Sequence, residues 1–175
     1  MCLKKSIPGW QIAGFLFTSV VGTLLHFLFE WTGENTVVGL FSAVNESIWE
    51  HMKLVYVPMF FFALIQKRFA DDGNFWCVKL AGMITALTLI PVLYYTYTGA
   101  LGISADWFNI AIFFLAAGAA YYLENILFQR MIACPVKPAI AFGTLILIGV
   151  LFGIFTFYPP HIPLFDNPST GKFGI

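Results

Sequence analysis

Five long apolar segments constrain the fold of this chain more than any other feature of its sequence. They cover residues 10–31, 49–66, 76–98, 107–129 and 139–158. A helix needs about 20 predominantly apolar residues to cross the hydrocarbon core of a bilayer, and the five segments approach or exceed that length. The pattern therefore predicts an all-α fold: a polytopic membrane bundle of about five helices, forming one integral membrane domain over residues 1–175.

The composition supports a membrane protein and argues against a soluble one. Charged residues make up 10% of the chain and apolar residues 59%, whereas a soluble domain carries about 25% charged residues. The formal net charge is zero, so no bulk charge indicates a nucleic-acid partner. The three cysteines have neither the spacing of a metal site nor that of a disulfide framework, so we expect them to be unpaired.

The basic residues predict how the helices are oriented. With the N-terminus in the cytoplasm, only Lys53 and Lys172 of the nine lysines and arginines fall on the outer side. Cytoplasmic loops carry an excess of Lys and Arg. The sequence therefore predicts a multi-pass protein with a cytoplasmic N-terminus and an extracytoplasmic C-terminus.

Acids and histidines gather at the predicted outer ends of the helices. All three histidines and six of the nine acidic residues belong to this group. They are His26, His51, His161, Glu30, Glu34, Glu46, Glu50, Asp106 and Asp166. An ionisable residue inside a spanning segment is costly in lipid and normally faces the bundle interior or a wet cavity. We therefore expect a functional site at the outer face.

Two stretches bring these polar residues close to the membrane. In HFLFEW, His26 and Glu30 are four residues apart and share a helix face, where they could simply pair with each other. In NESIWEHMK, residues 45–53, a capped helix start is the simplest interpretation, with Asn45 or Ser42 as the N-cap. Capping leaves the later ionisable residues of this stretch unexplained, because they should already be entering the headgroup region.

A metal site between the outer ends of the first two helices explains both stretches better. The expected ligands are two imidazoles and two carboxylates: His26, Glu30, Glu50 and His51. Such a set suits zinc, iron or manganese. A metal held there could activate water for hydrolysis, with Glu46 as the general base. The chain has no HExxH motif, so this prediction rests on residue types rather than on spacing.

Other residues of NESIWEHMK are candidates for contacts with a substrate. They are Asn45, Trp49 and Lys53. Of these, the lysine could bind a phosphate group as a compact cation.

Two further segments could complete the outer face. The loop at 32–48 is apolar at its centre but too short to span, so it is either an amphipathic loop or a re-entrant piece that covers the site. The C-terminal stretch 159–175 is rich in proline and turn formers. We expect it to fold back as a cap that brings His161 and Asp166 toward the substrate, or to be an ordered cap without chemistry.

Two features lie away from this face. Glu124, near the inner end of the fourth segment, could bind a proton or a substrate, or could be satisfied by Arg130 or nearby tyrosines. Gly149 and Gly153 form a GxxxG pattern in the fifth segment. This pattern is typical of a helix-packing face, either within the bundle or between two protomers of a homodimer.

Three stretches together resemble a known family. HFLFEWTGEN, AVNESIWEHMK and PPHIPLFDNPSTGKFGI are similar to a family of small prokaryotic membrane proteins that is classed only as a domain of unknown function. The resemblance covers nearly the whole chain. It implies the cytoplasmic membrane of a bacterium or archaeon, and it brings no assigned activity.

The leading hypothesis is a membrane-embedded metal-dependent hydrolase that acts on a lipid or lipid-linked substrate at the outer leaflet. Two alternatives stay open. The same carboxylates could bind protons or cations in a small transporter, with Glu124 extending the path inward. The protein could also be an accessory subunit whose polar rim binds another protein. An enzyme needs the outer residues but can spare Glu124, whereas a transporter needs both.

Overall fold

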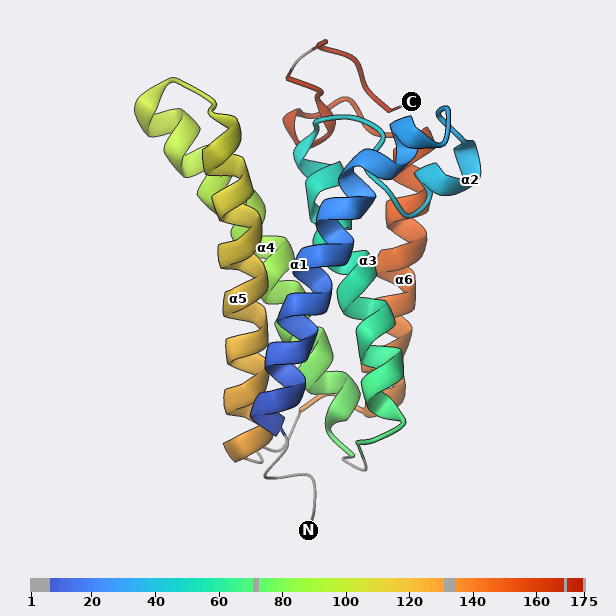
Figure 1. Cartoon of the computed structure of the whole chain (residues 1–175), viewed down its shortest axis with the longest axis vertical. Helices are drawn as coiled ribbons and strands as arrows, with labels where there is room; N and C mark the ends of the chain where they lie inside the picture. Colours follow the sequence, from blue (N-terminus) through green and yellow to red (C-terminus); the bar gives the residue numbers. More distant parts are fainter. Residues whose placement is uncertain (1–6, 71–72, 131–134, 169, 175) are drawn as a thin grey trace.

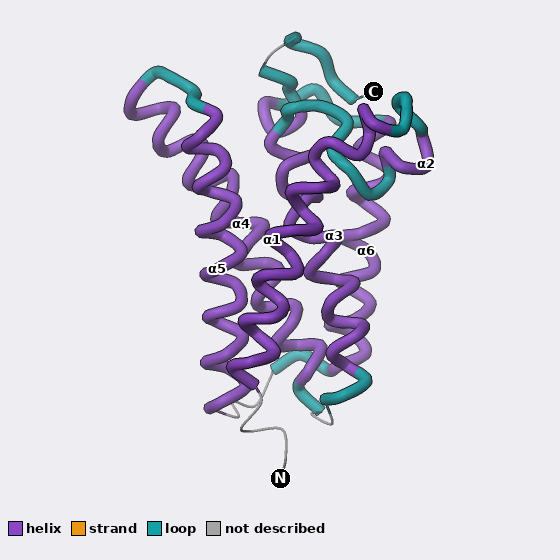
Figure 2. Tube along the Cα trace, viewed as in Figure 1, coloured by secondary structure: helices purple, strands orange, loops and turns teal. Residues whose placement is uncertain are grey.

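The computed structural model describes residues 7–70, 73–130, 135–168 and 170–174. Within these ranges the chain is helical without strands, which confirms the predicted fold class (Figures 1 and 2). Five helices are long and apolar enough to span a membrane. They are α1 (Ile7–Trp31), α3 (Ile48–Lys67), α4 (Phe75–Leu101), α5 (Asp106–Arg130) and α6 (Pro138–Phe157).

α3 is the central helix of the bundle. About two thirds of its most apolar window, 67%, is buried, against 22% for α1 and for α6. It packs against α1, α4 and α6. Because three helices surround α3, its polar side chains enter the interior instead of facing lipid.

The N-terminus and the C-terminus lie at opposite ends of the bundle (Figure 1). The end that carries residues 159–174 is uppermost in Figure 1 and is called the upper end below; it is the end predicted to lie outside. α1 and α5 pack side by side near the lower end and diverge toward the upper end (Figure 1). The orientation of the bundle in the membrane stays a prediction.

Two small elements cover part of the upper end. The short helix α2 (Thr36–Gly39) is capped by Asn35, whose Oδ1 atom accepts hydrogen bonds from the backbone of Val37 and Val38. α2 lies beside the upper ends of the long helices (Figure 1). The 3₁₀ turn η2 (Pro163–Phe165) belongs to the C-terminal tail, residues 159–174.

The glycines of the GxxxG pattern on α6 contact other parts of the same chain. A Cβ atom on Gly149 would lie 3.2 Å from the Tyr56 hydroxyl, and one on Gly153 would lie 3.4 Å from Leu40. The GxxxG face is therefore occupied within the chain.

Cys77, in the first turn of α4, is disulfide-bonded, so the expectation of unpaired cysteines was wrong at this position. Cys2 and Cys134 lie outside the described residues.

Candidate functional site

The NESIWEHMK stretch begins with a turn and then enters α3. Ser47 is the N-cap, and its hydroxyl accepts a hydrogen bond from the Glu50 backbone. The predicted caps, Asn45 and Ser42, were wrong because the helix starts later. The Asn45 Oδ1 atom instead accepts from the Ser47 backbone at 2.9 Å, and its amide nitrogen donates to the Gly174 carbonyl at 2.9 Å. Asn45 thus shapes the turn and holds the tail.

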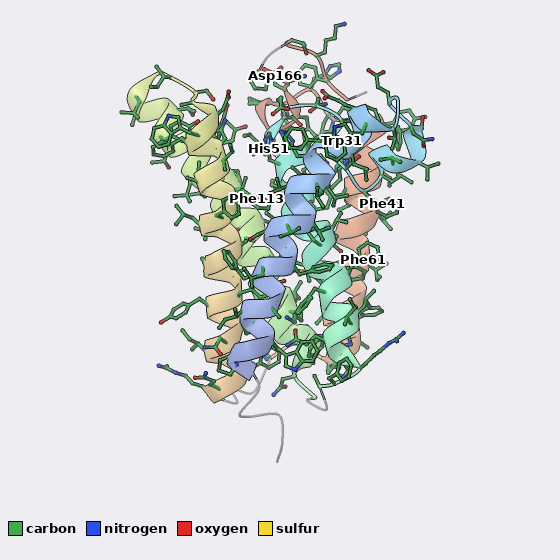
Figure 3. The ribbon with its side chains drawn as sticks, in the orientation of Figure 1. Trp31, Phe41, His51, Phe61, Phe113 and Asp166 are labelled. Carbon is green, nitrogen blue, oxygen red and sulfur yellow. The ribbon has the colours of Figure 1, made fainter. Side chains whose placement is uncertain are left out.

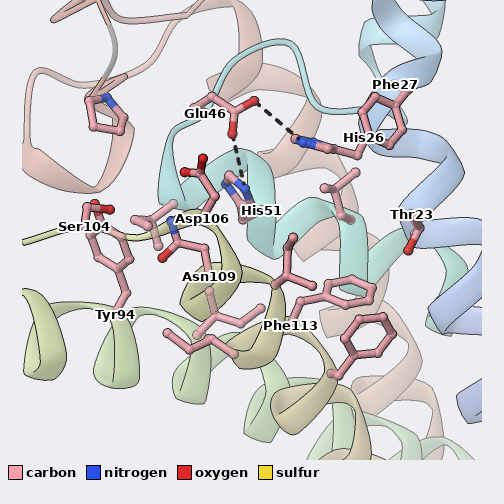
Figure 4. Close-up of a pocket in the computed structure, with 18 residues that line it drawn as sticks. Thr23, His26, Phe27, Glu46, His51, Tyr94, Ser104, Asp106, Asn109 and Phe113 are labelled. Atoms are coloured by element: carbon pink, nitrogen blue, oxygen red, sulfur yellow. Dashed lines mark ion pairs between the residues drawn. The ribbon is translucent and has the colours of Figure 1, made fainter.

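Three of the predicted site residues converge at the upper end. His26 comes from α1, Glu46 from the turn before α3, and His51 from the first turns of α3. The Nε2 atom of His26 lies 3.7 Å from Glu46 Oε1, and the Nε2 atom of His51 lies 3.5 Å from Glu46 Oε2 (Figure 4). One carboxylate therefore offers one oxygen to each of two imidazoles.

The geometry of this cluster fits a small metal ion. Its three ligand atoms all lie within 4.8 Å of one another. In a tetrahedral zinc site with bonds of 2.0–2.1 Å, neighbouring ligand atoms are roughly 3.4 Å apart, so ligand atoms that lie within 4.8 Å of one another would have to move closer to bind one ion. The cluster has two imidazoles and one carboxylate, and the same set of ligands occurs in catalytic zinc sites.

The two histidines differ in how their rings are held. The Nδ1 atom of His51 lies 2.9 Å from the Ser47 carbonyl. A carbonyl can only accept, so this contact places the proton on Nδ1 and leaves Nε2 free as a ligand, as in most metal-binding histidines. The Nδ1 atom of His26 is buried and has no hydrogen-bond partner among the described residues. The ring of His51 is therefore the better oriented of the two.

Glu50 and Lys53 are not part of this cluster. They form a buried ion pair, with 2% and 0% of their side chains exposed and 2.5 Å between Glu50 Oε2 and Lys53 Nζ. Lys53 also donates to the Gly39 carbonyl at 2.7 Å and to Thr156 at 2.8 Å. Glu50 accepts from the Val44 backbone and from Thr156. The expected ligand Glu50 and the expected substrate contact Lys53 instead join α3 to α6, to α2 and to the loop after α2.

Glu30 and Trp49 also lie apart from the histidines. Glu30 is exposed at the end of α1, and the ion pair of His26 runs to Glu46 instead. Trp49 packs its indole against Phe152 of α6 and Phe165 of the tail, with ring centroids 4.5 and 4.8 Å away. Trp49 therefore fixes the tail to the bundle from below.

The tail lies over the upper end, but its polar residues stay within it. The His161 ring packs on Phe173 at 4.7 Å, and Asp166 forms a β-bridge with Phe173. Figure 3 places Asp166 above His51, toward the tip of the bundle. The structure does not bring His161 and Asp166 into the three-residue cluster; a separate small cavity is lined by His161 and Asn45.

The cluster lies on the wall of a cavity of about 800 Å³ between α1, α3, α4 and α5. Its polar wall includes residues of α5 and the loop before it that the sequence did not single out as site residues. They are Ser104, Asp106 and Asn109 (Figure 4). The remainder is mostly apolar and includes Leu54, Ile90, Ile112 and Phe113. Pro168 of the tail completes the wall.

Glu124 has a partner that the sequence did not predict. Its Oε2 atom lies 2.5 Å from Nζ of Lys79, and both side chains are at most 1% exposed. The Lys79 ammonium also lies 5.5–5.8 Å from the ring centroids of Phe75, Tyr121 and Phe128. Three aromatic faces and one carboxylate thus compensate for the buried cation, and Glu124 Oε1 has no hydrogen-bond partner among the described residues.

Comparison with known proteins adds a family and no activity. Residues 3–175 match the model of a family of unknown function, DUF6512. Neither a curated protein nor a solved structure matches the chain.

Proposed function

The chain belongs to that family of unknown function, which confirms the resemblance seen in its sequence, and we propose from its own residues that it is a membrane-embedded metal-dependent hydrolase that acts on a lipid. The observation that carries the proposal is the position of His26, Glu46 and His51 on the wall of a large, mostly apolar cavity. Ligand cavities of this size, roughly 300–1,000 Å³, take small molecules and bury most of their surface.

The protein supplies three ligands to the metal in this proposal. Catalytic zinc sites keep three protein ligands and leave the next position open for water or substrate. The metal would lower the pKa of a bound water and so provide a nucleophile at neutral pH. Since Glu46 directs one oxygen to each histidine, we now assign it as a ligand rather than as the general base.

The general base then has to come from another element. Asp106, in the first turn of α5, lines the same cavity and faces it from the opposite side to His26 (Figure 4). We propose that its carboxylate takes a proton from the attacking water and delivers it to the leaving group. General acid–base catalysis of this kind contributes roughly 10²–10⁴-fold to a rate.

The test is the metal content of the protein purified in detergent, measured by elemental mass spectrometry after exposure to zinc, iron or manganese. We expect about one metal per chain in the wild type and none in a His26→Ala, His51→Ala double variant. His161→Ala is the matched control, because His161 lies at the same end and contacts Phe173 instead of the cluster. A wild type without metal, or a double variant that keeps it, would overturn the proposal.

A second candidate function follows from the Lys79–Glu124 pair. A buried ionisable pair in a membrane helix bundle is often part of an ion or proton path, and Glu124 has one carboxylate oxygen without a partner among the described residues. In a transporter this pair would be needed together with the upper cluster. The hydrolase needs only the upper cluster, so variants of Glu124 distinguish the two.

A further inference from the structure

The cavity that holds the cluster is bordered by two different surfaces. One border is polar and belongs to the upper end of the bundle, where Glu46 and Asp106 are both exposed. The other border runs along spanning helices and is mostly apolar. Its exposed apolar members are Phe27 of α1, 43% exposed, and Ile110 and Phe114 of α5, 58% and 37% exposed; the exposed Thr23 of α1 is its polar member. A cavity for a water-soluble ligand would not need an exposed apolar border along its spanning helices.

The divergence of α1 from α5 explains where the apolar border comes from. Lower in the bundle Gly22 allows close packing, since a Cβ atom there would lie 2.7 Å from both the Leu54 carbonyl and the Phe113 ring. Toward the upper end the two helices separate (Figure 1), and the cavity is lined by residues of both, among them His26 of α1 and Asn109 of α5. Phe27 of α1 and Ile110 of α5 therefore give the cavity an exposed apolar border on each of the two diverging helices.

The charges in the cavity indicate which headgroup fits. Its described lining contains the carboxylates of Glu46 and Asp106 and no lysine or arginine. Proteins bind phosphate groups with Arg or Lys, and Lys53, the one lysine of NESIWEHMK, is buried in its pair with Glu50. Two carboxylates and one divalent metal sum to zero charge. An uncharged headgroup suits such a site better than a phosphate.

Asn109 supplies a hydrogen-bond donor to this headgroup. The Tyr97 hydroxyl donates to Asn109 Oδ1 at 2.5 Å, and Tyr97 in turn accepts from the Ala105 backbone. These contacts use the carbonyl side of the amide, so its NH₂ group is the side left for a ligand. An NH₂ donor in the polar wall matches a carbonyl oxygen.

We propose that the substrate is a neutral acyl lipid, a carboxylic ester or amide, that enters sideways from the bilayer between α1 and α5. This inference rests on the proposed hydrolase function. The water oxygen bonds to the carbonyl carbon while Asn109 donates to the carbonyl oxygen. The bond from that carbon to the leaving oxygen or nitrogen then breaks. One water proton passes through Asp106 to the leaving alcohol or amine, and the other stays with the carboxylic acid product until it ionises.

The experiment uses the metal-loaded full chain in nanodiscs with three probes: monooleoylglycerol, N-oleoylethanolamine and dioleoyl phosphatidic acid. Oleate and inorganic phosphate are measured by mass spectrometry. We expect oleate from at least one of the first two probes and no phosphate from the third. Asp106→Asn should lower oleate release by roughly a hundredfold, without loss of bound metal.

Lateral access has its own variant and control. Ile110→Trp narrows the apolar border of the cavity, and Leu115→Trp places the same ring on α5 at a site that is 62% exposed and does not line the cavity. We expect the first variant to slow release of oleate from the lipid probes, and not the hydrolysis of the short ester 4-nitrophenyl acetate. The second variant should change neither rate. Equal effects of the two variants on the lipid probes would overturn lateral access.

The outcomes separate the inference from the proposed function. Bound metal together with phosphate release, or with no oleate from either acyl probe, would overturn the neutral acyl substrate and leave the metal site standing. Absence of metal in the same preparation would overturn the proposed function itself.

Discussion

Glu50 uses one carboxylate oxygen, Oε2, for two contacts: the ammonium of Lys53 at 2.5 Å and the backbone amide of Val44 at 3.2 Å. The ion pair is thereby connected to the turn that carries Glu46, two residues after Val44. Buried charges in NESIWEHMK thus hold the loop in place beside the histidines and take no part in the proposed metal site.

Removal of one partner of this pair should be costly. Lys53→Met leaves the Glu50 carboxylate buried without its cation, and such a loss costs about 3–5 kcal/mol of folding stability. We expect a markedly lower unfolding temperature in detergent. The double variant Glu50→Gln, Lys53→Met removes both charges and should recover part of the loss; a double variant less stable than Lys53→Met would contradict this account.

Glu46 should matter for metal binding and little for the stability of the fold. Its side chain is 49% exposed, and its carboxylate oxygens contact the Nε2 atoms of the two histidines. Glu46→Gln removes a charged ligand, so we expect metal affinity to fall by more than the roughly 10–100-fold that loss of an outer partner costs. Titration with a competing chelator measures this affinity. Glu34→Gln, an exposed acid in the same loop region, should leave it unchanged.

The tail should loosen when its hydrogen bond to the turn is removed. Asn45→Asp keeps the oxygen that accepts from Ser47 and removes the amide donor to Gly174. A net hydrogen bond is worth about 1 kcal/mol, so exchange of backbone amides in residues 165–173 should accelerate several-fold. Hydrogen exchange read by mass spectrometry tests this, and α3 should show no change; equal protection of the tail in both proteins would contradict the prediction.

The Lys79–Glu124 pair should prove structural. Glu124→Gln leaves a buried ammonium with only three aromatic faces around it, and we expect a loss of about 3–5 kcal/mol. The double variant Lys79→Met, Glu124→Leu should be much more stable than the single one, and should keep both its metal and its hydrolytic activity. A double variant that is stable and metal-loaded but inactive would contradict the hydrolase hypothesis and support the transport hypothesis.

The helices could be predicted from sequence because lipid imposes a simple rule. Every spanning segment must be long and apolar, and the five segments begin and end close to the observed helices. The outer histidines could be found for a related reason, since His26 and His51 stand out in apolar surroundings. Tertiary contacts follow no such rule. Lys79 and Glu124 lie 45 positions apart, and nothing local marks them as partners.

The roles predicted for Glu46 and Glu50 differ from the observed ones because α3 starts later than the sequence suggested. With Ser47 as the N-cap, Glu46 stays outside α3 and can reach both histidines, while Glu50 sits in the first turn and points to Thr156 of α6. A cap two residues earlier would have placed both acids on one helix face. Asp106 and Asn109 were missed as site residues because they come from the start of α5, and only the divergence of α5 from α1 makes them face the cluster.

Asn45 and Glu46 are adjacent in the chain, yet one is bonded to the tail and the other to the histidines. A single peptide unit therefore joins the order of the tail to the occupancy of the proposed metal site. Coupling of this kind is reciprocal: by whatever factor bound metal favours the ordered tail, the ordered tail must raise the affinity for metal. The C-terminal tail would then act as a built-in effector that raises the affinity of the chain for metal.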